Sequence, residues 1–294
     1  MTNLSTKMSL RPSDSEGKQS IKKIATSADV RRPPRNDKDL LLSFINAYLK
    51  ERPAFMSFIR PQEALLFNKY KEYITAPVLD FGCGDGFFAQ VAFGKNKLDI
   101  GLEVKNNLRI EEAKKRNVYK KILTYDGITI PLKNNSMQTV ISNCVFEHIP
   151  NISNSVSEIY RILKKDGYCV TSVMTSDWSD MMFGTKFFGK NYAKWMNRRQ
   201  EHESLLSKKQ WETLFKKAGF NVMEEVGYIN ENTAKWLDLF HYLSLPSLIT
   251  YKLFKKWVLL PQFFQIFRLK ERVKEITKSP SKNKYGAFFY VLKK

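Results

Sequence analysis

Hydrophobic positions recur at two different spacings along the chain. Over residues 40–49 they follow a helical period, and a second helical stretch follows Pro61. Between residues 76 and 175, short β-rich runs alternate with helical ones. This alternation predicts an α/β fold with a doubly wound, mostly parallel sheet that binds ligands at the carboxyl ends of its strands. The expected strands lie at 77–81, 98–102, 122–125, 139–142 and 168–173, and the expected helices at 87–93, 108–116 and 152–163.

The pattern becomes less regular towards the end of the chain. The helix at 152–163 runs into two lysines and Gly167, which are expected to end it. Residues 176–206 are rich in Met, Phe, Lys and Arg without a strand pattern, and we interpret them as a lid. The later elements are a helix at 207–218, a strand at 221–226, an apolar and basic helical insertion at 233–278, and a last strand at 286–292.

These elements divide the chain into consecutive segments. The first segment mixes Ser, Thr, Lys and Asp and lacks the apolar stretch of a secretory signal, so we expect a disordered basic tail. The segments are the tail at 1–38, N-terminal helices at 39–75, an α/β core at 76–232 that includes the lid, the insertion at 233–278, and the last core strand at 279–294.

Charge is the unusual feature of the composition. The chain has 49 Lys and Arg against 29 Asp and Glu, a net charge of +20, which predicts attraction to an anionic partner. The hydrophobic fraction of 43% excludes collagen-like and wholly disordered proteins. Cys83, Cys144 and Cys169 show no paired spacing of metal ligands and suit a reducing cytoplasm.

Glycines follow the first expected strand at alternate positions. After Asp80 come Gly82, Gly84 and Gly86, and a helix begins directly afterwards. Glycines at such a turn let the backbone approach a ligand closely. Asp85 adds a negative charge where a diphosphate would lie, which disfavours a dinucleotide and favours a ligand with a cationic, amino-acid-like end. A glycine turn without a ligand is the alternative interpretation.

Two acids end the next two strands. Glu103 lies 21 residues after Gly82, where a carboxylate can accept both hydroxyls of a ribose. Asp126 follows the third strand, where it can accept from an adenine amino group. Either acid alone is compatible with a solvated strand end. In this order and at these intervals, they indicate an adenosine pocket.

These motifs resemble those of the class I S-adenosylmethionine-dependent methyltransferases. Residues 78–86 are similar to the glycine motif of that family, 101–104 to its ribose-binding strand end, and 125–127 to its adenine contact. Residues 142–149 resemble the Ser-Asn-x-x-x-Glu-His stretch of its small-molecule branch. Glu103 stands where the family more often has Asp. The resemblance implies a Rossmann-like seven-stranded sheet whose last strand is antiparallel, with the helical insertion before that strand.

The resemblance also implies a set of contacts to S-adenosylmethionine, without a metal. Asp80, Gly82 and Gly84 would hold the methionine end, Glu103 and Asp126 the nucleoside, and side chains after the fourth strand would lie next to the reactive methyl group. The full expected set is Asp80, Gly82, Cys83, Gly84, Gly86, Glu103, Val104, Asp126, Gly127, Asn143 and Cys144.

Histidines are the candidates for a general base. An oxygen acceptor gains nucleophilicity when it loses its proton, and His is suited to accept it near neutrality. His148 follows the fourth strand, and His202 lies between the lid and the next helix. Both are candidate catalytic residues, with a structural hydrogen-bonding role as the alternative. His241 lies in the apolar insertion, where a core or interface role is expected.

The insertion predicts contact with an anionic membrane surface. Its longest uncharged runs, 239–251 and 257–267, are shorter than the roughly 18 residues that span a bilayer. Residues 251–294 carry twelve basic and two acidic side chains, and the same segment contains the aromatic residues Trp257, Phe263, Phe264 and Phe267. Such a surface is typical of interfacial segments. A helical cap on the core and a nucleic-acid-binding surface are the alternatives.

We therefore expect a cytoplasmic methyltransferase, peripheral on the membrane, that acts on a small-molecule or lipid-linked glycan or glycolipid acceptor, at oxygen. The absence of an Asn-Pro-Pro-Tyr motif after the fourth strand disfavours methylation of nucleic-acid bases. Two alternatives remain open. One is an RNA methyltransferase, which the net charge favours, and the other is a catalytically silent module that binds a membrane or a partner on the same fold. A nicotinamide oxidoreductase is the weakest alternative.

Overall fold

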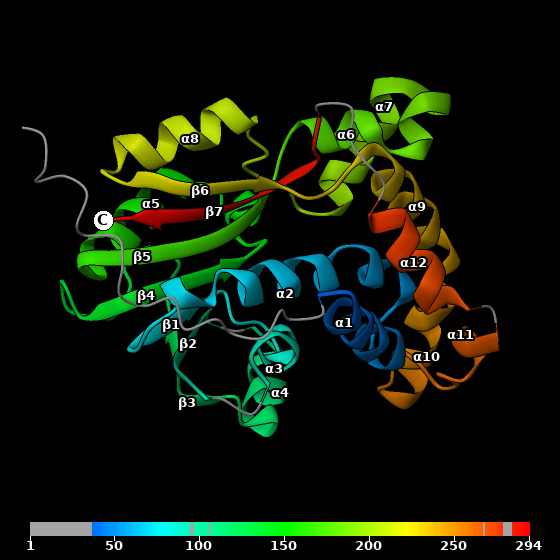
Figure 1. Cartoon of the computed structure of the whole chain (residues 1–294), viewed down its shortest axis with the longest axis horizontal. Coiled ribbons are helices and arrows are strands. Elements are labelled where there is room, and N and C mark those ends of the chain that lie inside the picture. The colour runs from blue at the N-terminus through cyan, green and yellow to red at the C-terminus, as the bar shows by residue number, and fades with distance from the viewer. Residues whose placement is uncertain (1–36, 95–96, 106, 267, 279–283) are drawn as a thin grey trace, which may run out of the picture. The chain divides into compact units, whose positions relative to one another are not determined.

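The computed structural model describes residues 37–94, 97–105, 107–266, 268–278 and 284–294. The basic tail expected at 1–38 therefore lies almost entirely outside the described residues. Within them, the alternating pattern of the sequence corresponds to alternating strands and helices (Figure 1).

A seven-stranded sheet forms the centre of the fold, in the order β3-β2-β1-β4-β5-β7-β6. The pairs among β1 to β5 are all parallel, whereas β7 runs antiparallel between β5 and β6. The expected sheet, with its antiparallel last strand, is thus confirmed. The strands are β1 (Val78–Phe81), β2 (Leu98–Val104), β3 (Tyr119–Tyr125), β4 (Met137–Asn143), β5 (Leu163–Met174), β6 (Asn221–Gly227) and β7 (Ala287–Lys293).

Helices cover both faces of the sheet because its strands are apolar on both sides. Val78 packs into the core below α2, α3 and α4, whereas Leu79 and Phe81 pack into the core below α5 and α8. The helices are α1 (Asp37–Glu51), α2 (Arg60–Lys69), α3 (Phe87–Phe93), α4 (Ile110–Arg116), α5 (Ile152–Ile162), α6 (Asp177–Met181), α7 (Phe183–Arg199), α8 (Lys208–Lys217), α9 (Glu231–Leu243), α10 (Pro246–Phe254), α11 (Phe263–Ile266) and α12 (Leu269–Thr277).

The expected end of α5 at Gly167 is wrong. Strand β5 already begins at Leu163, which pairs with Met137, and the four residues 164–167 form a bulge before Tyr168 pairs with Thr139. Gly167 is required there for a close approach, because a Cβ would lie 2.9 Å from the carbonyl oxygen of Gln138. The glycine therefore belongs to strand packing and does not cap the helix.

The N-terminal helices and the insertion lie together at the carboxyl side of the parallel strands. Figure 1 shows α9 to α12 beside α1, with α6 and α7 next to them. Phe58, in the short 3₁₀ turn Ala54–Phe58, packs its ring 4.9 Å from that of Phe240 in α9. Residues far apart in the sequence thus build one helical layer over the edge of the sheet where ligands are expected. Among the described residues, no helix is long and apolar enough to cross a membrane.

Candidate active site

The glycine loop after β1 has the backbone conformation that its sequence predicts. Gly82, Gly84 and Gly86 have φ angles of +76°, +54° and +75°, which side-chain-bearing residues rarely adopt. A Cβ on Gly82 would lie 2.6 Å from Val145, so this glycine is needed for packing. A Cβ on Gly84 would meet no atom within 4 Å. The middle of the loop therefore faces open space, as a cradle for a ligand must.

Glu103 lies at the end of β2 with its carboxylate turned towards this loop. One oxygen accepts from the backbone N–H of Gly84 at 2.8 Å, and the other from that of Val104 at 3.0 Å. The side chain is buried, and each oxygen keeps a second lone pair for a ligand hydroxyl. The residues present thus fit the ribose end of S-adenosylmethionine. The expected neighbour Val104 is exposed.

Asp80 lies buried near the end of β1, where the sequence predicts it. Its hydrogen-bond partner was not predicted. The hydroxyl of Tyr119, at the start of β3, donates to the Asp80 carboxylate at 2.6 Å. Burial raises the pKa of Asp80 to about 7, although the hydrogen bond from Tyr119 lowers it. Tyr119 lies outside the strand expected from the sequence, which begins three residues later. The pattern of apolar residues alone does not reveal a polar contact between β1 and β3, which lie on either side of β2.

Asp85 has a different role from the one that its charge suggested. Its carboxylate forms an ion pair with Arg52, just after α1, and accepts from the N–H of Phe87 at 2.9 Å. The guanidinium of Arg52 also lies 4.2 Å from the centre of the Phe87 ring. Since the negative charge of Asp85 is compensated within the protein, it contributes less to ligand selection than the sequence indicated.

Asp126 lies exposed at the end of β3 and organises the loop that follows. One of its oxygens accepts from the N–H groups of Ile128 and Thr129, both at 2.9 Å, and these bonds lower the pKa of Asp126. Gly127 takes a φ of +84° within this turn. The second oxygen of Asp126 is left to meet an adenine amino group, so the expected contact fits the geometry.

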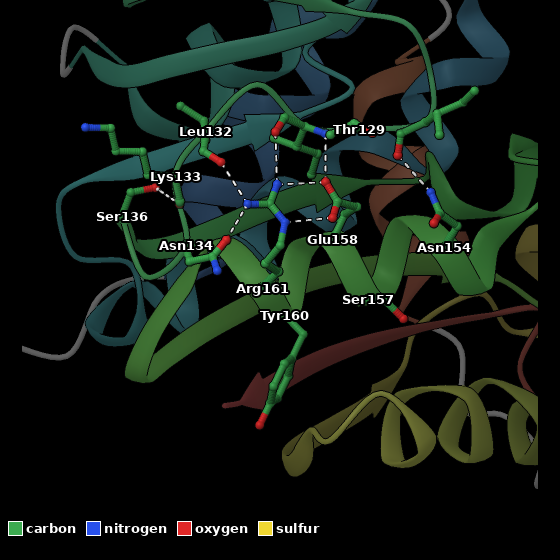
Figure 2. Close-up of polar contacts among 12 residues, drawn as sticks. Thr129, Leu132, Lys133, Asn134, Ser136, Asn154, Ser157, Glu158, Tyr160 and Arg161 are labelled. Atoms are coloured by element: carbon green, nitrogen blue, oxygen red, sulfur yellow. Dashed lines mark hydrogen bonds and ion pairs between the residues drawn. The ribbon is translucent and has the colours of Figure 1, made fainter.

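The loop after β3 is tied to α5 by an arginine that sequence analysis did not single out for this role (Figure 2). Arg161 makes a two-pronged ion pair with Glu158, with both N···O distances at 2.7 Å. It also donates to the carbonyl oxygens of Ile130 and Leu132 at 3.0 and 2.9 Å, and to Asn134 at 2.7 Å. Its planar group therefore fixes the loop that carries the expected adenine contact.

Asn143 and Cys144 lie at the end of β4, as expected, but each is already engaged by the protein. The Asn143 side chain accepts from the Ser172 hydroxyl at 2.7 Å. Cys144 has a φ of +50°, uncommon for a residue with a side chain, and its thiol donates to Glu63 at 3.0 Å. Burial raises the pKa of the Cys144 thiol, which is therefore neutral. Cys83 is buried beside the loop, and its pKa is raised in the same way.

Glu63 is the centre of a buried polar cluster above this strand end. It is 0% exposed and accepts from Arg60 at 2.9 Å and from the hydroxyl of Tyr228 at 2.8 Å, besides the thiol of Cys144. These residues come from α2, from β4 and from the segment after β6, so no local sequence pattern connects them. We assign the cluster to positioning α2 over the active-site edge.

The structure brings the two candidate catalytic histidines together. The rings of His148 and His202 lie 5.2 Å apart, and the buried carboxylate of Glu147 lies beside them. Burial and the neighbouring His148 lower the pKa of His202 to about 4, so this imidazole is neutral at physiological pH. His241 lies apart from them, with its ring 4.7 Å from that of Phe55. This packing agrees with the core or interface role expected for it.

Comparisons with known proteins identify the family and agree with the fold. A family model described as a methyltransferase domain matches residues 38–225. A solved structure from Galdieria sulphuraria, proposed to be a sarcosine dimethylglycine methyltransferase, is similar at 16% identity and a TM-score of 0.51, over 79% of this chain and 83% of that one. A protein of Thermotoga maritima, described as an S-adenosylmethionine-dependent methyltransferase and proposed to act on histamine, shares 19% identity at a TM-score of 0.49, over 87% and 98% of the chains. No curated protein sequence matches.

Proposed function

Since the chain belongs to the S-adenosylmethionine-dependent methyltransferases of class I, we propose that it methylates a hydroxyl oxygen of a small or lipid-linked acceptor, such as a glycolipid, at an anionic membrane surface. The bound cofactor supplies a methyl group on a sulfonium, which needs alignment with the acceptor and shelter from water more than further activation. The acceptor's hydroxyl group loses its proton as the new carbon–oxygen bond forms and the carbon–sulfur bond breaks.

The chain's own residues supply the cofactor contacts in this proposal. Asp80 receives the ammonium of the methionine end, Gly84 allows its close approach, and Glu103 takes the ribose hydroxyls. The flanking residues of the expected set, Cys83, Gly86, Val104 and Gly127, contribute backbone and van der Waals contacts. In this proposal the helices beside this edge, α1, α9 and α12, are assigned the exclusion of water from the pocket.

The histidine pair at the end of β4 is where the acceptor hydroxyl would be activated. His148 lies in the 3₁₀ turn that follows Asn143 and Cys144 in the chain, and the ring of His202 lies 5.2 Å from that of His148. An imidazole nitrogen can take the acceptor's proton, and because burial lowers the pKa of His202 to about 4, His148 is the candidate base and His202 its neighbour. A base beside the acceptor fits a hydroxyl group, which gains nucleophilicity when it loses its proton.

One observation carries the membrane part of the proposal: a continuous stretch of the insertion exposes its large apolar side chains. In ordinary helical caps such side chains face the core, but here Leu253 and Leu260 are 70% and 71% exposed. Lys252, Lys255 and Lys256 are exposed in the same stretch, which favours anionic lipid. We name this the insertion surface; its exposed apolar members are Leu243, Leu245, Leu248, Ile249, Leu253, Phe254, Leu259, Leu260 and Phe263.

Cosedimentation with vesicles tests the proposal. We expect wild-type protein to bind vesicles that contain phosphatidylserine, and salt to weaken that binding. The double substitution Leu253→Ser and Phe254→Ser removes two exposed side chains without touching the core, and it should reduce the bound fraction severalfold. Met223→Ser, an exposed change on β6, is the matched control and should bind as wild type does. Vesicle binding unaffected by the double substitution, or tight binding of RNA with methyl incorporation into it, would contradict the membrane proposal.

A further inference from the structure

A fully buried carboxylate lies beside the two histidines. Glu147 is 0% exposed, and neither of its oxygens has a hydrogen-bond donor among the described residues. The nearby thiol of Cys144 donates to Glu63 instead. An ionised carboxylate without donors is unfavourable in a protein interior, and such groups are normally paired or bound to a metal ion. A cation bound beside Glu147 would remove this cost.

The side chains around Glu147 match the donor set of a cation site. A carboxylate oxygen of Glu147 and a ring nitrogen each of His148 and His202 all lie within 4.8 Å of one another. Donors around a tetrahedral zinc ion, with bonds of about 2.0–2.2 Å, lie about 3.4 Å apart, so a closure of at most about 1.5 Å completes the site.

Hydrogen bonds already hold the two contributing segments together. The Nδ1 of His148 lies 3.1 Å from the carbonyl oxygen of Glu201. When this nitrogen donates to the carbonyl, Nε2 keeps its lone pair and the ring is held in one orientation, as is usual for histidines that bind metals. Ser204 adds two bonds, from its N–H to the Glu147 carbonyl at 2.9 Å and from its hydroxyl to that of Ile149 at 2.6 Å.

His202 is also prepared for a ligand. Its Nδ1 is buried and has no hydrogen-bond partner among the described residues, so this ring nitrogen is available to a ligand. Glu201, just before it, takes a left-handed φ of +56°, and the N–H of His202 donates to Asn197 at 3.0 Å. The backbone turn at the end of α7 thus directs this imidazole towards the 3₁₀ turn Phe146–His148.

We propose that Glu147, His148 and His202 form a binding site for one divalent cation of the zinc class. Two imidazoles and one carboxylate suit Zn²⁺, Co²⁺ or Ni²⁺ better than the oxygen-preferring Mg²⁺ and Ca²⁺. Three protein ligands leave a fourth position for water or for an oxygen of the acceptor. The site departs from the expectation of a metal-free enzyme. Because a bound cation occupies the imidazole lone pairs, it would replace the histidines as the group that activates the acceptor hydroxyl. That role rests on the proposed function, but the binding of the cation does not.

Calorimetry with Zn²⁺ tests the site directly, on the full chain without a polyhistidine tag. The chain has three histidines, so each imidazole can be removed in turn. We expect one Zn²⁺ per chain, and His148→Ala, His202→Ala and Glu147→Gln should each weaken its binding by more than about 100-fold, since even partners of metal ligands contribute 10–100-fold. His241→Ala, which removes the histidine beside Phe55, is the matched control and should bind Zn²⁺ as wild type does.

Two further readouts separate the possible failures. His148 is exposed, so His148→Ala is expected to fold normally. Circular dichroism checks the folding of each variant. If the buried Glu147→Gln unfolds, His148→Ala still tests the site. Co²⁺ should give visible d–d absorption bands with wild type and lose them in His148→Ala. Absence of Zn²⁺ binding by folded wild-type protein, or equal affinity in all three site variants, would overturn the proposal. Binding of S-adenosylmethionine in the same preparation reports separately on the proposed function.

Discussion

The hydroxyl of Tyr119 donates a 2.6 Å hydrogen bond to the buried carboxylate of Asp80. This contact links the start of β3 to the end of β1 across β2, directly below the glycine loop. Because burial raises the pKa of Asp80 to about 7, the ionisation of this carboxylate changes within the physiological range. The charge expected to meet the ammonium group of S-adenosylmethionine therefore depends on pH.

Cofactor affinity should fall as the pH drops below about 7. Protonation of Asp80 removes the negative charge, so affinity decreases by up to about tenfold per pH unit below its pKa. Tyr119→Phe removes a bond that lowers this pKa and should move the midpoint to higher pH. Asp80→Asn should bind weakly at every pH. Calorimetric titrations across this range check the prediction, and a wild-type affinity independent of pH between 5 and 9 would contradict it (both limits being about two units from the midpoint).

Two glycine substitutions should separate packing from ligand binding. Gly84→Ala places a methyl group in open space, so the fold should survive with a backbone cost of about 1–2 kcal/mol while cofactor affinity falls more than about tenfold. Gly82→Ala has a similar backbone cost and also collides with Val145, so it should lower stability considerably more. Urea unfolding and calorimetry measure the two effects. Equal losses of stability in the two variants would count against this assignment.

Arg161 should stabilise the fold through the shape of its guanidinium group. Arg161→Ala removes the paired bonds to Glu158 and three further bonds to the loop after β3, and we expect a loss of about 1.5–3 kcal/mol in the free energy of unfolding. Arg161→Lys keeps the positive charge but lacks the planar guanidinium group that makes two parallel bonds to Glu158, so it should recover less than half of the lost stability. Denaturant unfolding followed by circular dichroism measures both. Full recovery by lysine would show that charge alone matters.

The buried cluster around Glu63 should be among the most sensitive sites in the fold. Glu63→Ala leaves the charge of Arg60 and the hydroxyl of Tyr228 without their acceptor, with an expected loss of about 3–5 kcal/mol. Glu111→Ala removes an exposed carboxylate whose ion pair with Lys114 lies in solvent, and it should leave stability nearly unchanged. Thermal unfolding of the two variants gives the comparison. A loss at Glu63 as small as that at Glu111 would contradict the role assigned to the cluster.

The sequence predicted the local elements and the loop chemistry of this protein well. The alternation of apolar runs places β1, β2 and α3 nearly to the residue, and the spacing of glycines predicts the left-handed turns at Gly82, Gly84 and Gly86. These features depend on backbone conformation and on the strand period, which short stretches of sequence specify. The contacts to a bound cofactor are not tested by the fold and stay predictions.

The contacts that local patterns did not predict are long-range ones. Tyr119 meets Asp80 across 39 positions, and Glu63 meets Tyr228 across 165. Such pairs depend on how separate elements pack, and neither residue carries a local sign of its partner. The position of His202 beside His148 has the same origin: the segment after α7 returns to the end of β4 only in the folded chain.

Calorimetry of S-adenosylmethionine with wild-type protein and Glu103→Ala tests the central claim most directly. Glu103 is buried and its carboxylate reaches the glycine loop, so its loss should weaken micromolar binding by about 1–3 kcal/mol, while the exposed Glu111→Ala leaves affinity unchanged. Circular dichroism confirms that each variant is folded. Weaker binding by Glu103→Ala alone would establish the cofactor site. No detectable binding by folded wild-type protein, or equal affinity in all three proteins, would contradict the account.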